Sequence, residues 1–430
     1  MDIAVIGGGI AGLVAAWRLS QRHAVTLFER RTAPGFTASS VAVGDGRLRV
    51  DVPLRVFYPG YYPTLTRLYA ELGIAIQPVD YATTFTGADG QPYFRWRNLR
   101  LGGWSWPFVL PQDVSGRHGA RARRIVAGAL RFNRRAHAAL AAGTLGNSSI
   151  GDFVSAEGIA PEFVDGLLLP AIATIGTCTT ADARAYPAVV VAGYAGAGLS
   201  RQSVHRARDG ADAVAQRLLA RIAHVVCDAG LSGVARTPDG GVLLRHRAGV
   251  QRFDQVVFAT QANHALALLD DATPAERAAL AAFRYRALDV VMHRDERLMP
   301  ARRAHWSPVN AMVEPQFERP QSTIWINRVQ PALRAAEPLF QTVMPQVEAR
   351  DELVLSRARF ERPLLDAHSE ENIAALQRLH TEPSRRCWWC GSYAMPGVPL
   401  LESAVRSALA VADGIESAAC SPGRVAESIA

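Results

Sequence analysis

Residues 7–12 of the chain, GGGIAG, match the pattern G-x-G-x-x-G. In this pattern the glycine at position 1 (Gly7) permits a tight turn, and the glycine at position 3 (Gly9) lets a diphosphate approach the backbone. The glycine at position 6 (Gly12) lets a helix pack on a strand. A carboxylate, Glu29, follows 20 residues after Gly9, a spacing typical of the acidic residue that binds an adenosine ribose. These residue types at this spacing predict a dinucleotide site.

The flanking sequence predicts the elements that must position this site. Asp2–Ile6 has the short apolar pattern of a buried strand, Gly12–Gln21 that of a helix, and Ala24–Glu29 that of a second strand. The amino terminus of such a helix offers N–H donors and positive potential to phosphates. The three segments predict a strand–helix–strand unit with the glycines at its first turn.

The sequence beyond this unit argues against a dedicated NAD(P) enzyme. Proteins that bind NAD through this fingerprint usually continue with alternating strands and helices. This chain instead shows a turn-rich stretch at Thr32–Val52, a helix at Tyr62–Leu72, and a further buried strand only at Phe253–Thr260. A second glycine group, Gly193–Gly198, has the wrong glycine order and no acidic strand end after it, so we expect a loop there.

Several segments resemble the flavin-dependent amine oxidases and their relatives. Phe253–Thr260 (FDQVVFAT) resembles their D-x-V-V-x-A-T-P strand, with Gln261 in place of the usual proline. Ala207–Leu219 resembles the helix that packs beside the second strand set of that family. Trp388–Tyr393 followed by Leu401–Ile415 resembles the family's C-terminal flavin motif, in which the amino terminus of the helix faces the isoalloxazine.

A narrower resemblance is to a bacterial group of predicted flavoproteins whose genes often accompany cyclopropane fatty-acid synthase-type methyltransferases. Three segments carry it: Ala282–Met292, Ile324–Gln330 and Pro338–Pro345. The chain departs from that group at two places near the flavin. Asp51–Leu54 replaces an Asp-Thr-Gly-Phe element, and Gly397–Glu402 replaces a Gly-Phe-His-Glu-Asp-Gly element.

The resemblance implies an α/β fold, in which a discontinuous Rossmann-type FAD-binding domain carries an inserted α+β substrate domain. The expected FAD-binding domain comprises residues 1–60, 200–285 and 370–430. The expected substrate domain comprises residues 61–199 and 286–369. The implied cofactor is therefore FAD.

The resemblance also implies site residues. The family has a Gly-Gly pair at the flavin phosphate, where this chain has Gly35 followed by Phe36. Three tyrosines are the candidate catalytic residues: Tyr58, Tyr62 and Tyr393. The candidate cofactor-binding residues are Gly7, Gly9, Ile10, Ala11, Gly12, Glu29, Arg30, Gly35, Phe36, Thr37, Val225, Ala259, Thr260, Gly391, Ser392, Leu400 and Leu401.

The expected reaction is oxidation or desaturation, in which a hydride passes from a substrate C–H to flavin N5. We expect an apolar or acyl-type substrate. Two alternatives stay open: a flavin isomerase or cyclase without net redox change, and a flavoprotein that binds lipid or a partner without turnover. The chain contains no lysine, so all 47 of its Lys+Arg cations are arginine. Because many amine oxidases of the superfamily place a lysine near N5, we expect slow turnover of simple primary amines.

Composition excludes several other classes of protein. The chain has 430 residues, of which 49% are hydrophobic and 20% charged, which is typical of a globular protein of two or three domains. The histidines are scattered and predict no metal site. No motif for nucleic acid accompanies the net charge of +8. Cys387 and Cys390 form a C-x-x-C on a predicted strand, where positions i and i+3 face opposite sides, so we expect structural cysteines.

One arginine-rich helix suggests a partner. Arg117–Arg135 carries seven arginines on an alanine-rich background, and such a stretch can touch an anionic membrane surface or an acyl carrier protein. A solvated charged face is the more common outcome, and we favour it. No targeting segment or spanning apolar run is recognised, so we expect a cytoplasmic protein with an optional peripheral membrane contact.

Overall fold

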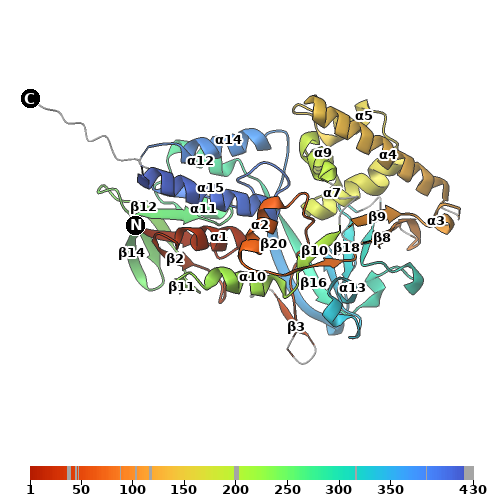
Figure 1. The fold of residues 1–430 in the computed structure, drawn as a ribbon, viewed down its shortest axis with the longest axis horizontal. Helices are drawn as coiled ribbons and strands as arrows, with labels where there is room; N and C mark the ends of the chain where they lie inside the picture. Colours follow the sequence, from red (N-terminus) through yellow and green to blue (C-terminus); the bar gives the residue numbers. More distant parts are fainter. Residues whose placement is uncertain are drawn as a thin grey trace, which may run out of the picture.

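The computed structural model has two lobes, each built around its own β-sheet (Figure 1). The residues that it describes are 1–35, 40–43, 46, 48–87, 89–101, 104–115, 119–197, 203–314, 317–383 and 385–420.

The first lobe contains a five-stranded sheet in which all neighbouring strands run parallel. Its strand order is β11 (His224–Val226), β2 (Ala24–Phe28), β1 (Asp2–Ile6), β15 (Gln255–Phe258) and β21 (Cys387–Trp389). Strands from both ends and from the middle of the chain thus complete one sheet. This topology confirms the predicted discontinuous Rossmann-type domain.

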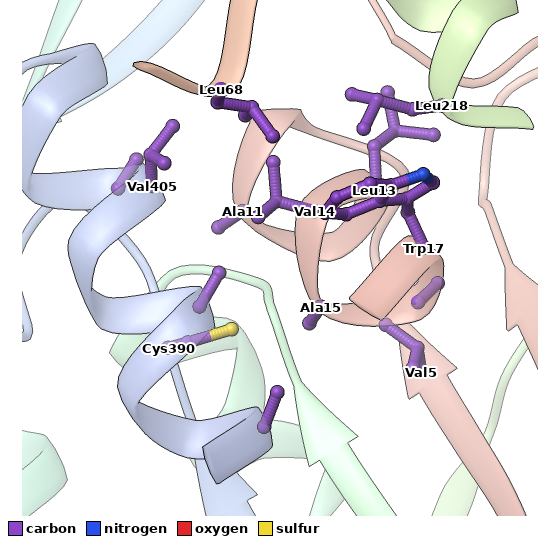
Figure 2. Packing of buried hydrophobic residues seen from close by; sticks show 14 of the residues in the cluster. Val5, Ala11, Leu13, Val14, Ala15, Trp17, Leu68, Leu218, Cys390 and Val405 are labelled. Atoms are coloured by element: carbon purple, nitrogen blue, oxygen red, sulfur yellow. The ribbon is translucent and has the colours of Figure 1, made fainter. Parts of the chain in front are cut away.

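One face of the parallel sheet is covered by helices that pack around α1 (Figure 2). Leu68, Leu218 and Val405 approach α1 from three different helices. Because α1 is apolar on almost every side, with Leu13, Val14 and its alanines buried, it needs such a complete cover. The helices are α1 (Ile10–Leu19), α2 (Pro63–Glu71), α10 (Gly210–Leu219) and α15 (Leu401–Cys420).

The opposite face of the same sheet carries a separate core that includes Phe28, Phe258 and Trp389. An antiparallel meander and three helices supply the remaining apolar side chains of this core. The elements are β12 (Gly233–Arg236), β13 (Val242–His246), β14 (Gly249–Phe253), α11 (Ala262–Leu268), α12 (Pro274–Ala281) and α14 (Ser369–His380).

The second lobe is built on a seven-stranded mixed sheet, in which β17 pairs with β6 in parallel and the other neighbours are antiparallel. Its long pair, β16 and β20, connects it to the first lobe. The strand order is β20 (Val354–Pro363), β16 (Tyr285–His293), β19 (Phe340–Val343), β18 (Gln321–Trp325), β17 (Val309–Met312), β6 (Thr83–Thr86) and β7 (Pro92–Arg95). This α+β architecture agrees with the predicted substrate domain.

A helical cluster packs against one end of this sheet (Figure 1). It consists of α3 (Pro111–Ser115), α4 (Gly119–Ala142), α5 (Ile150–Ala156), α6 (Pro161–Phe163), a π-helical turn (Val164–Leu168), α7 (Leu169–Gly176), α8 (Thr180–Arg184) and α9 (Ala188–Gly196). The remaining elements are the hairpins β3 (Val41–Val43) with β4 (Leu48–Val50) and β8 (Arg97–Leu101) with β9 (Trp104–Phe108), the pair β5 (Ile76–Val79) with β10 (Val204–Ala207), α13 (Ile326–Val329), and 3-10 turns at Glu296–Leu298, Arg303–His305, Pro331–Leu333 and Asp351–Leu353.

Helix α9 contradicts the loop that the glycine group at Gly193–Gly198 predicted, since the helix continues to Gly196. Ala188, Val191 and Ala192 are buried in the helical cluster. Burial of these side chains outweighs the low helix propensity of glycine, which costs about 1 kcal/mol per residue.

Other local predictions are confirmed. The strand–helix–strand unit lies within one residue or two of its predicted bounds. The sequence Thr273-Pro274-Ala275-Glu276 is typical of a capped helix start, and Thr273 Oγ1 indeed accepts from Glu276 N–H at the start of α12. Cys387 and Cys390 are buried free thiols in the cores on opposite faces of the sheet, as expected for structural cysteines.

The predicted domain boundaries stay a prediction. Helix α2, which follows residue 60, packs against α15 and belongs to the core around α1. Among the described residues, none of the helices combines the length and the apolarity needed to cross a membrane.

Candidate functional site

The turn between β1 and α1 depends on two glycines. Gly7 has φ = +106°, and its N–H donates to Phe28 O at 2.8 Å. A Cβ on Gly12 would lie 1.8 Å from Gly7 O, so the helix can pack on the turn only with glycine there. Both roles are those predicted from the motif, and both are internal to the protein.

Gly9 differs from these two glycines, because a Cβ built on it would meet no heavy atom of the described residues within 4 Å. It is the N-cap of α1, and no described side chain caps this helix end. The first amides of the helix, those of Ile10, Ala11 and Gly12, therefore need an acceptor from outside the helix. An open backbone with helix N–H donors matches the needs of a diphosphate.

Glu29 lies beside this helix end at the carboxyl end of β2. Its carboxylate accepts a hydrogen bond from Gly8 N–H at 2.7 Å and another from Arg31 N–H at 2.8 Å. Only 8% of Glu29 is exposed. Each carboxylate oxygen keeps a second lone pair, so the fixed carboxylate can still accept from a ribose hydroxyl. Arg30, the next candidate, is exposed.

A segment that the sequence analysis missed runs past this carboxylate. Asp228 N–H donates to Arg31 O at 3.0 Å, and Ala229 N–H donates to Glu29 O at 3.0 Å. Val225, the candidate from this part of the chain, lies three residues before Asp228 on edge strand β11 and is 37% exposed. The positive φ of Asp228, 49°, is a tertiary feature that no motif announces.

Gly35 closes the turn from the other side. Its N–H donates to Gly8 O at 2.6 Å, and a Cβ on it would lie 2.7 Å from the Cβ of Ala215. The glycine thus lets α10 pack against the turn. Phe36 and Thr37, also candidates, lie outside the described residues.

Ala259 and Thr260 lie where β15 ends beside the same turn. Ala259 N–H donates to Ile6 O at 2.8 Å. A Cβ on Gly7 would lie 3.0 Å from Ala259 O and 3.2 Å from Thr260 Cγ2. These two candidates therefore form a wall of the turn, at the carboxyl edge of the parallel sheet where ligands bind in such folds.

The C-terminal motif is held by its own local packing. Gly391 N–H donates to Ser407 Oγ at 2.9 Å, which ties the end of β21 to α15. A Cβ on Gly391 would lie 2.7 Å from Cε1 of Tyr393, so the tyrosine ring already accounts for the glycine. Ser392, Leu400 and Leu401 are each half-buried, and Leu401 is the first residue of α15.

Glu402, in the first turn of α15, has a role that the sequence did not predict. Its carboxylate accepts hydrogen bonds from Thr64 N–H at 3.0 Å and Leu65 N–H at 2.9 Å. These are amides of the first turn of α2, so Glu402 caps a helix 337 residues away in sequence. Only 4% of Glu402 is exposed.

The three candidate catalytic tyrosines are not brought together. Tyr58 and Tyr62 are in edge-to-face contact, with ring centroids 5.9 Å apart, in the core around α1. Tyr393 lies in the core on the opposite face of the sheet, 4.8 Å from the Phe283 ring. A shared catalytic group of all three is therefore not formed, and the role of each stays a prediction.

Tyr58 and Tyr62 belong to a larger aromatic cluster between the lobes. Tyr58 Oη donates to Tyr194 O at 2.5 Å, and the rings of Tyr61 and Tyr194 lie 4.6 Å apart. Tyr61 Oη accepts from Val398 N–H at 2.7 Å. Burial raises the pKa of Tyr58, Tyr61 and Tyr62 above the usual value, so these phenols are neutral near pH 7.

A groove of about 380 Å³ opens beside this cluster. It lies between the start of α2, α9 and the segment around Pro396, and its wall combines Tyr61 with Val189 and Val190. Arg406, Glu370 and Glu402 are the charged residues of its lining, and Glu402 is the residue that caps α2. An apolar wall with a few charged groups is typical of a small-molecule site.

Long-range hydrogen bonds hold Asp51–Leu54, one of the two segments that depart from the flavoprotein group that the sequence resembles. Gln341 in β19 accepts from Leu54 N–H at 2.7 Å and donates to Asp51 O at 3.0 Å. Asp51 Oδ1 accepts from Ala211 N–H at 3.0 Å, at the amino terminus of α10. Desolvation raises the pKa of the buried Asp51 carboxyl above its usual value.

Most described arginines of α4 are engaged within the protein. Arg124 pairs with Glu162 at 2.6 Å, and Arg135 pairs with Glu157 at 3.2 Å. Arg121 stacks over the Tyr93 ring, with 3.7 Å from Cζ to the ring centroid. Arg117 lies outside the described residues. Within the part of the chain that the structure describes, no group of His, Cys, Asp and Glu could hold a metal ion.

Comparisons with known proteins agree with this geometry. A family model described as an NAD(P)-binding Rossmann-like domain matches residues 5–72. Thiamine thiazole synthase of Desulfosudis oleivorans is 34% identical over an alignment of 96 residues, and the match covers 18% of this chain and 37% of that protein. The matching part thus spans little more than a third of that relative.

Solved structures match almost the whole chain. A fatty acid isomerase from P. acnes that produces CLA has a TM-score of 0.67 at 16% identity, over 96% of this chain and 98% of that one. A variant of putrescine oxidase gives 0.67 at 14% identity, over 97% and 99%. Cyclohexylamine oxidase from Brevibacterium oxydans gives 0.64 at 13% identity, over 96% and 99%.

At these identities the likeness concerns the fold. The predicted α/β fold agrees with these comparisons. The chain therefore has the fold of the amine oxidases and related oxidoreductases that its sequence motifs resemble.

Proposed function

We propose that the protein is an FAD-dependent oxidoreductase that oxidises or desaturates an apolar or acyl-type substrate. The observation that carries the proposal is the open backbone at Gly9, next to uncapped amides of α1 and the fixed carboxylate of Glu29. A dinucleotide needs these three features for its diphosphate and its ribose.

The residues present fit the ADP half of FAD. The amides of Ile10, Ala11 and Gly12 would donate to the diphosphate, and Glu29 would accept from the ribose. When bound, FAD supplies the acceptor for a hydride from the substrate C–H. The protein orients the substrate and excludes water, and the aromatic cluster of Tyr58, Tyr61, Tyr62 and Tyr194 is suited to both tasks because it is buried and uncharged.

The apolar side of the groove supports the proposed substrate class. Val189, Val190 and Tyr61 can bury a hydrocarbon chain, at about 25 cal/mol per Å² of apolar area removed from water. The charged residues Arg406 and Glu370 of the lining can orient a polar end of the substrate. Because no lysine is available, simple primary amines should be poor substrates.

A second candidate function is isomerisation without net redox change. The observation that favours it is the likeness to a solved fatty acid isomerase over nearly the full length of both chains. Reduction of oxygen or of a dye while the substrate is converted would indicate an oxidase. Product formation without any electron acceptor would indicate an isomerase or cyclase.

The decisive experiment is purification, followed by denaturation and identification of the released cofactor. We expect one FAD per chain, bleached by substrate or by a chemical reductant. A protein that retains NAD but never FAD would overturn the proposal. A bound flavin that neither substrate nor reductant bleaches would indicate a binding protein without turnover. Rapid peroxide formation with common monoamines would contradict the proposed substrate class.

We propose that a membrane surface, if one delivers the substrate, contacts hairpin β8–β9 rather than α4. Leu99 and Trp106 are paired across this hairpin and are 60% and 42% exposed, and Phe108 on the same face is 40% exposed. Exposed aromatic and aliphatic side chains are suited to a bilayer interface, and the net charge of +8 favours anionic lipid.

Co-sedimentation with anionic vesicles tests this contact. Trp106→Ser should weaken it, and Leu130→Ser, which removes an exposed leucine of α4, should not. Binding to an acyl carrier protein without vesicle binding would favour the carrier instead. Equal vesicle binding by the wild type and Trp106→Ser would exclude the hairpin.

A further inference from the structure

The groove beside the aromatic cluster has three charged residues in its lining, Arg406, Glu370 and Glu402. Glu402 is buried, and each oxygen of its carboxylate accepts an amide of the first turn of α2. This carboxylate is therefore already engaged. The charged groups that can meet a ligand are the other two, which have opposite signs.

Arg406 lies one turn after Glu402 on α15 and is exposed. Its Nη1 donates to Pro396 O at 3.5 Å, which is long for a hydrogen bond. Among the described residues it forms no ion pair, either with Glu402 on its own helix or with Glu370 of α14. Because a guanidinium has five N–H donors in a planar fork that matches a carboxylate, most of its donors are available to a ligand in the groove.

Tyr61 contributes a second donor to the lining. Its Oη accepts from Val398 N–H at 2.7 Å, and none of the described residues accepts the O–H in turn. Burial raises the pKa of this phenol, so the proton stays on it near pH 7. Arg406 lies close enough to Tyr61 to act on the same pKa, in the lowering direction. Two donors are therefore available at the same end of the groove.

Glu370 is the remaining charged residue of the lining. It lies in the first turn of α14, where the helix dipole stabilises a carboxylate, so its position has a structural reason without a ligand. Glu370 is also exposed, so water and salt screen its charge. The net charge of +8 adds a long-range attraction for anions. The groove is therefore better suited to an anionic group than to an ammonium group.

The uncharged part of the lining fits a hydrocarbon chain. Val189 and Val190 of α9 and Pro63 at the start of α2 supply apolar surface. The groove volume of about 380 Å³ lies in the usual range of small-molecule sites. The groove thus has room for a polar head group together with part of a chain.

We propose that this groove binds the carboxylate end of an amphiphilic substrate between the guanidinium of Arg406 and the hydroxyl of Tyr61. The chain of the substrate lies against Val189 and Val190. The inference rests on the proposed function, because it names the substrate class of the same groove: a free carboxylic acid rather than its ester, its thioester or an amine. Arg406 and Tyr61 are then specificity-determining residues.

The test measures binding to the full-length holoprotein by titration calorimetry, with decanoate, methyl decanoate and decylamine as probes. The wild type should bind decanoate more tightly than the other two. Arg406→Gln should weaken decanoate binding by about tenfold, because it removes a charged hydrogen-bond donor, and should leave methyl decanoate unchanged. Glu370→Gln, the matched variant of opposite sign, should not weaken decanoate binding.

Tyr61→Phe removes the second donor and keeps the ring. It should weaken decanoate binding by about threefold, again without an effect on methyl decanoate. The control is Arg217→Gln, which removes an arginine from the exposed side of α10 and changes the net charge equally. An equal loss of decanoate binding in Arg217→Gln and Arg406→Gln would assign the effect to net charge and overturn the inference.

Two other results would overturn it. One is a folded Arg406→Gln protein with wild-type affinity for decanoate. The other is tighter binding of decylamine than of decanoate, with loss of decylamine binding in Glu370→Gln, which would make the groove an ammonium site. If Arg406→Gln does not fold, Tyr61→Phe decides: equal decanoate affinity in this variant and in the wild type would overturn the inference.

Failure of this inference is distinguishable from failure of the proposed function, because binding of the probes requires no turnover. A protein that never retains FAD but binds decanoate through Arg406 would contradict the function alone. A protein that retains FAD and binds decanoate and methyl decanoate equally would contradict the carboxylate site alone.

Discussion

The glycine turn at residues 7–12 and the segment Asp51–Tyr62 border the same candidate site but are built in opposite ways. In the turn, the hydrogen-bond partners of Gly7 and Gly8 all lie between Phe28 and Gly35, and Ala259 and Thr260 add only packing contacts. The segment is held by hydrogen bonds that span 136 to 337 residues. They join Leu54 N–H to Gln341, Tyr58 Oη to Tyr194 O, and Val398 N–H to Tyr61 Oη. The turn is thus specified locally, and the segment depends on the finished fold.

We therefore expect the turn, as a candidate cofactor site, to be similar in many proteins. The segment Asp51–Tyr62, on the candidate substrate side, should differ from protein to protein. In the turn, glycine is required by geometry, so the same residues recur wherever the geometry does. In the segment, any side chain that satisfies a buried amide can serve. The departures from the family at Asp51–Leu54 and Gly397–Glu402 fall on the second kind of structure.

The largest expected effect compares two glycines of the turn. Gly12→Val would place a Cβ 1.8 Å from Gly7 O, a clash that no side-chain movement relieves. We expect loss of folded protein, at a cost on the order of 4 kcal/mol or more. Gly9→Ala meets nothing within 4 Å and should fold normally, with weaker FAD binding as its main defect.

Soluble yield, thermal unfolding and flavin absorbance distinguish the two variants. Equal stability of Gly12→Val and the wild type would mean that the turn is not built as described. Unchanged FAD affinity in Gly9→Ala would show that the cofactor does not approach this backbone.

A smaller effect is expected for the long-range contact to the segment. Gln341→Leu would leave Leu54 N–H and Asp51 O buried without this partner, at about 1–3 kcal/mol for each group. Chemical denaturation should therefore show a clear loss of stability. Gln377→Leu, on the exposed side of α14, is the control and should be close to neutral. A Gln341→Leu protein as stable as this control would contradict the assigned role.

We expect one buried histidine in each lobe to make the stability of the protein depend on pH. Burial lowers the pKa of His293 in the substrate lobe and of His380 beside Trp389 in the other lobe, each to about 4. Since the unfolded pKa is 6.5, the unfolded chain binds protons that the folded chain does not. Stability is therefore complete above about pH 6.5 and is lost as the pH falls toward 4, by about 3 kcal/mol for each histidine.

His293→Gln and His380→Gln should each flatten this profile, measured as unfolding free energy against pH. Asp295, beside His293, contributes in a separate window, because hydrogen bonds from Arg297 hold its pKa well below the usual range. A profile of His293→Gln that parallels the wild type between pH 6.5 and 4 would exclude the histidine as a source.

The smallest expected effect is that of Tyr61→Phe. It removes the acceptor of Val398 N–H and should cost about 1 kcal/mol. Because Tyr61 also lines the groove, substrate KM should change more than FAD affinity. A change of FAD affinity with constant KM would place the tyrosine at the cofactor rather than at the substrate.

The sequence predicted those parts of the molecule whose conformation is determined by neighbouring residues. The strand–helix–strand unit, the capped helix at Thr273 and the opposed cysteines follow from periodicity and capping, and the structure confirms them. The loop predicted at Gly193–Gly198 was wrong because packing against α4 stabilises a helix despite its glycines.

The contacts of the candidate site that escaped prediction are all tertiary. Glu402, Gln341 and Asp51 each satisfy amides far away in sequence, and a carboxylate or an amide on its own has no pattern that reveals its partner. The separation of Tyr393 from Tyr58 and Tyr62 is of the same kind, since it depends on which face of the sheet each segment covers.

The cap that Glu402 places on α2 has a consequence for synthesis of the chain. The amides of Thr64 and Leu65 emerge from the ribosome more than 300 residues before the carboxylate that binds them. Strand β21 and helix α15, which complete the sheet and cover α1, are also made more than 300 residues after α1. Until α15 is made and docks, the apolar helix α1 lacks part of its cover. We therefore expect nascent chains to depend on chaperones up to that point.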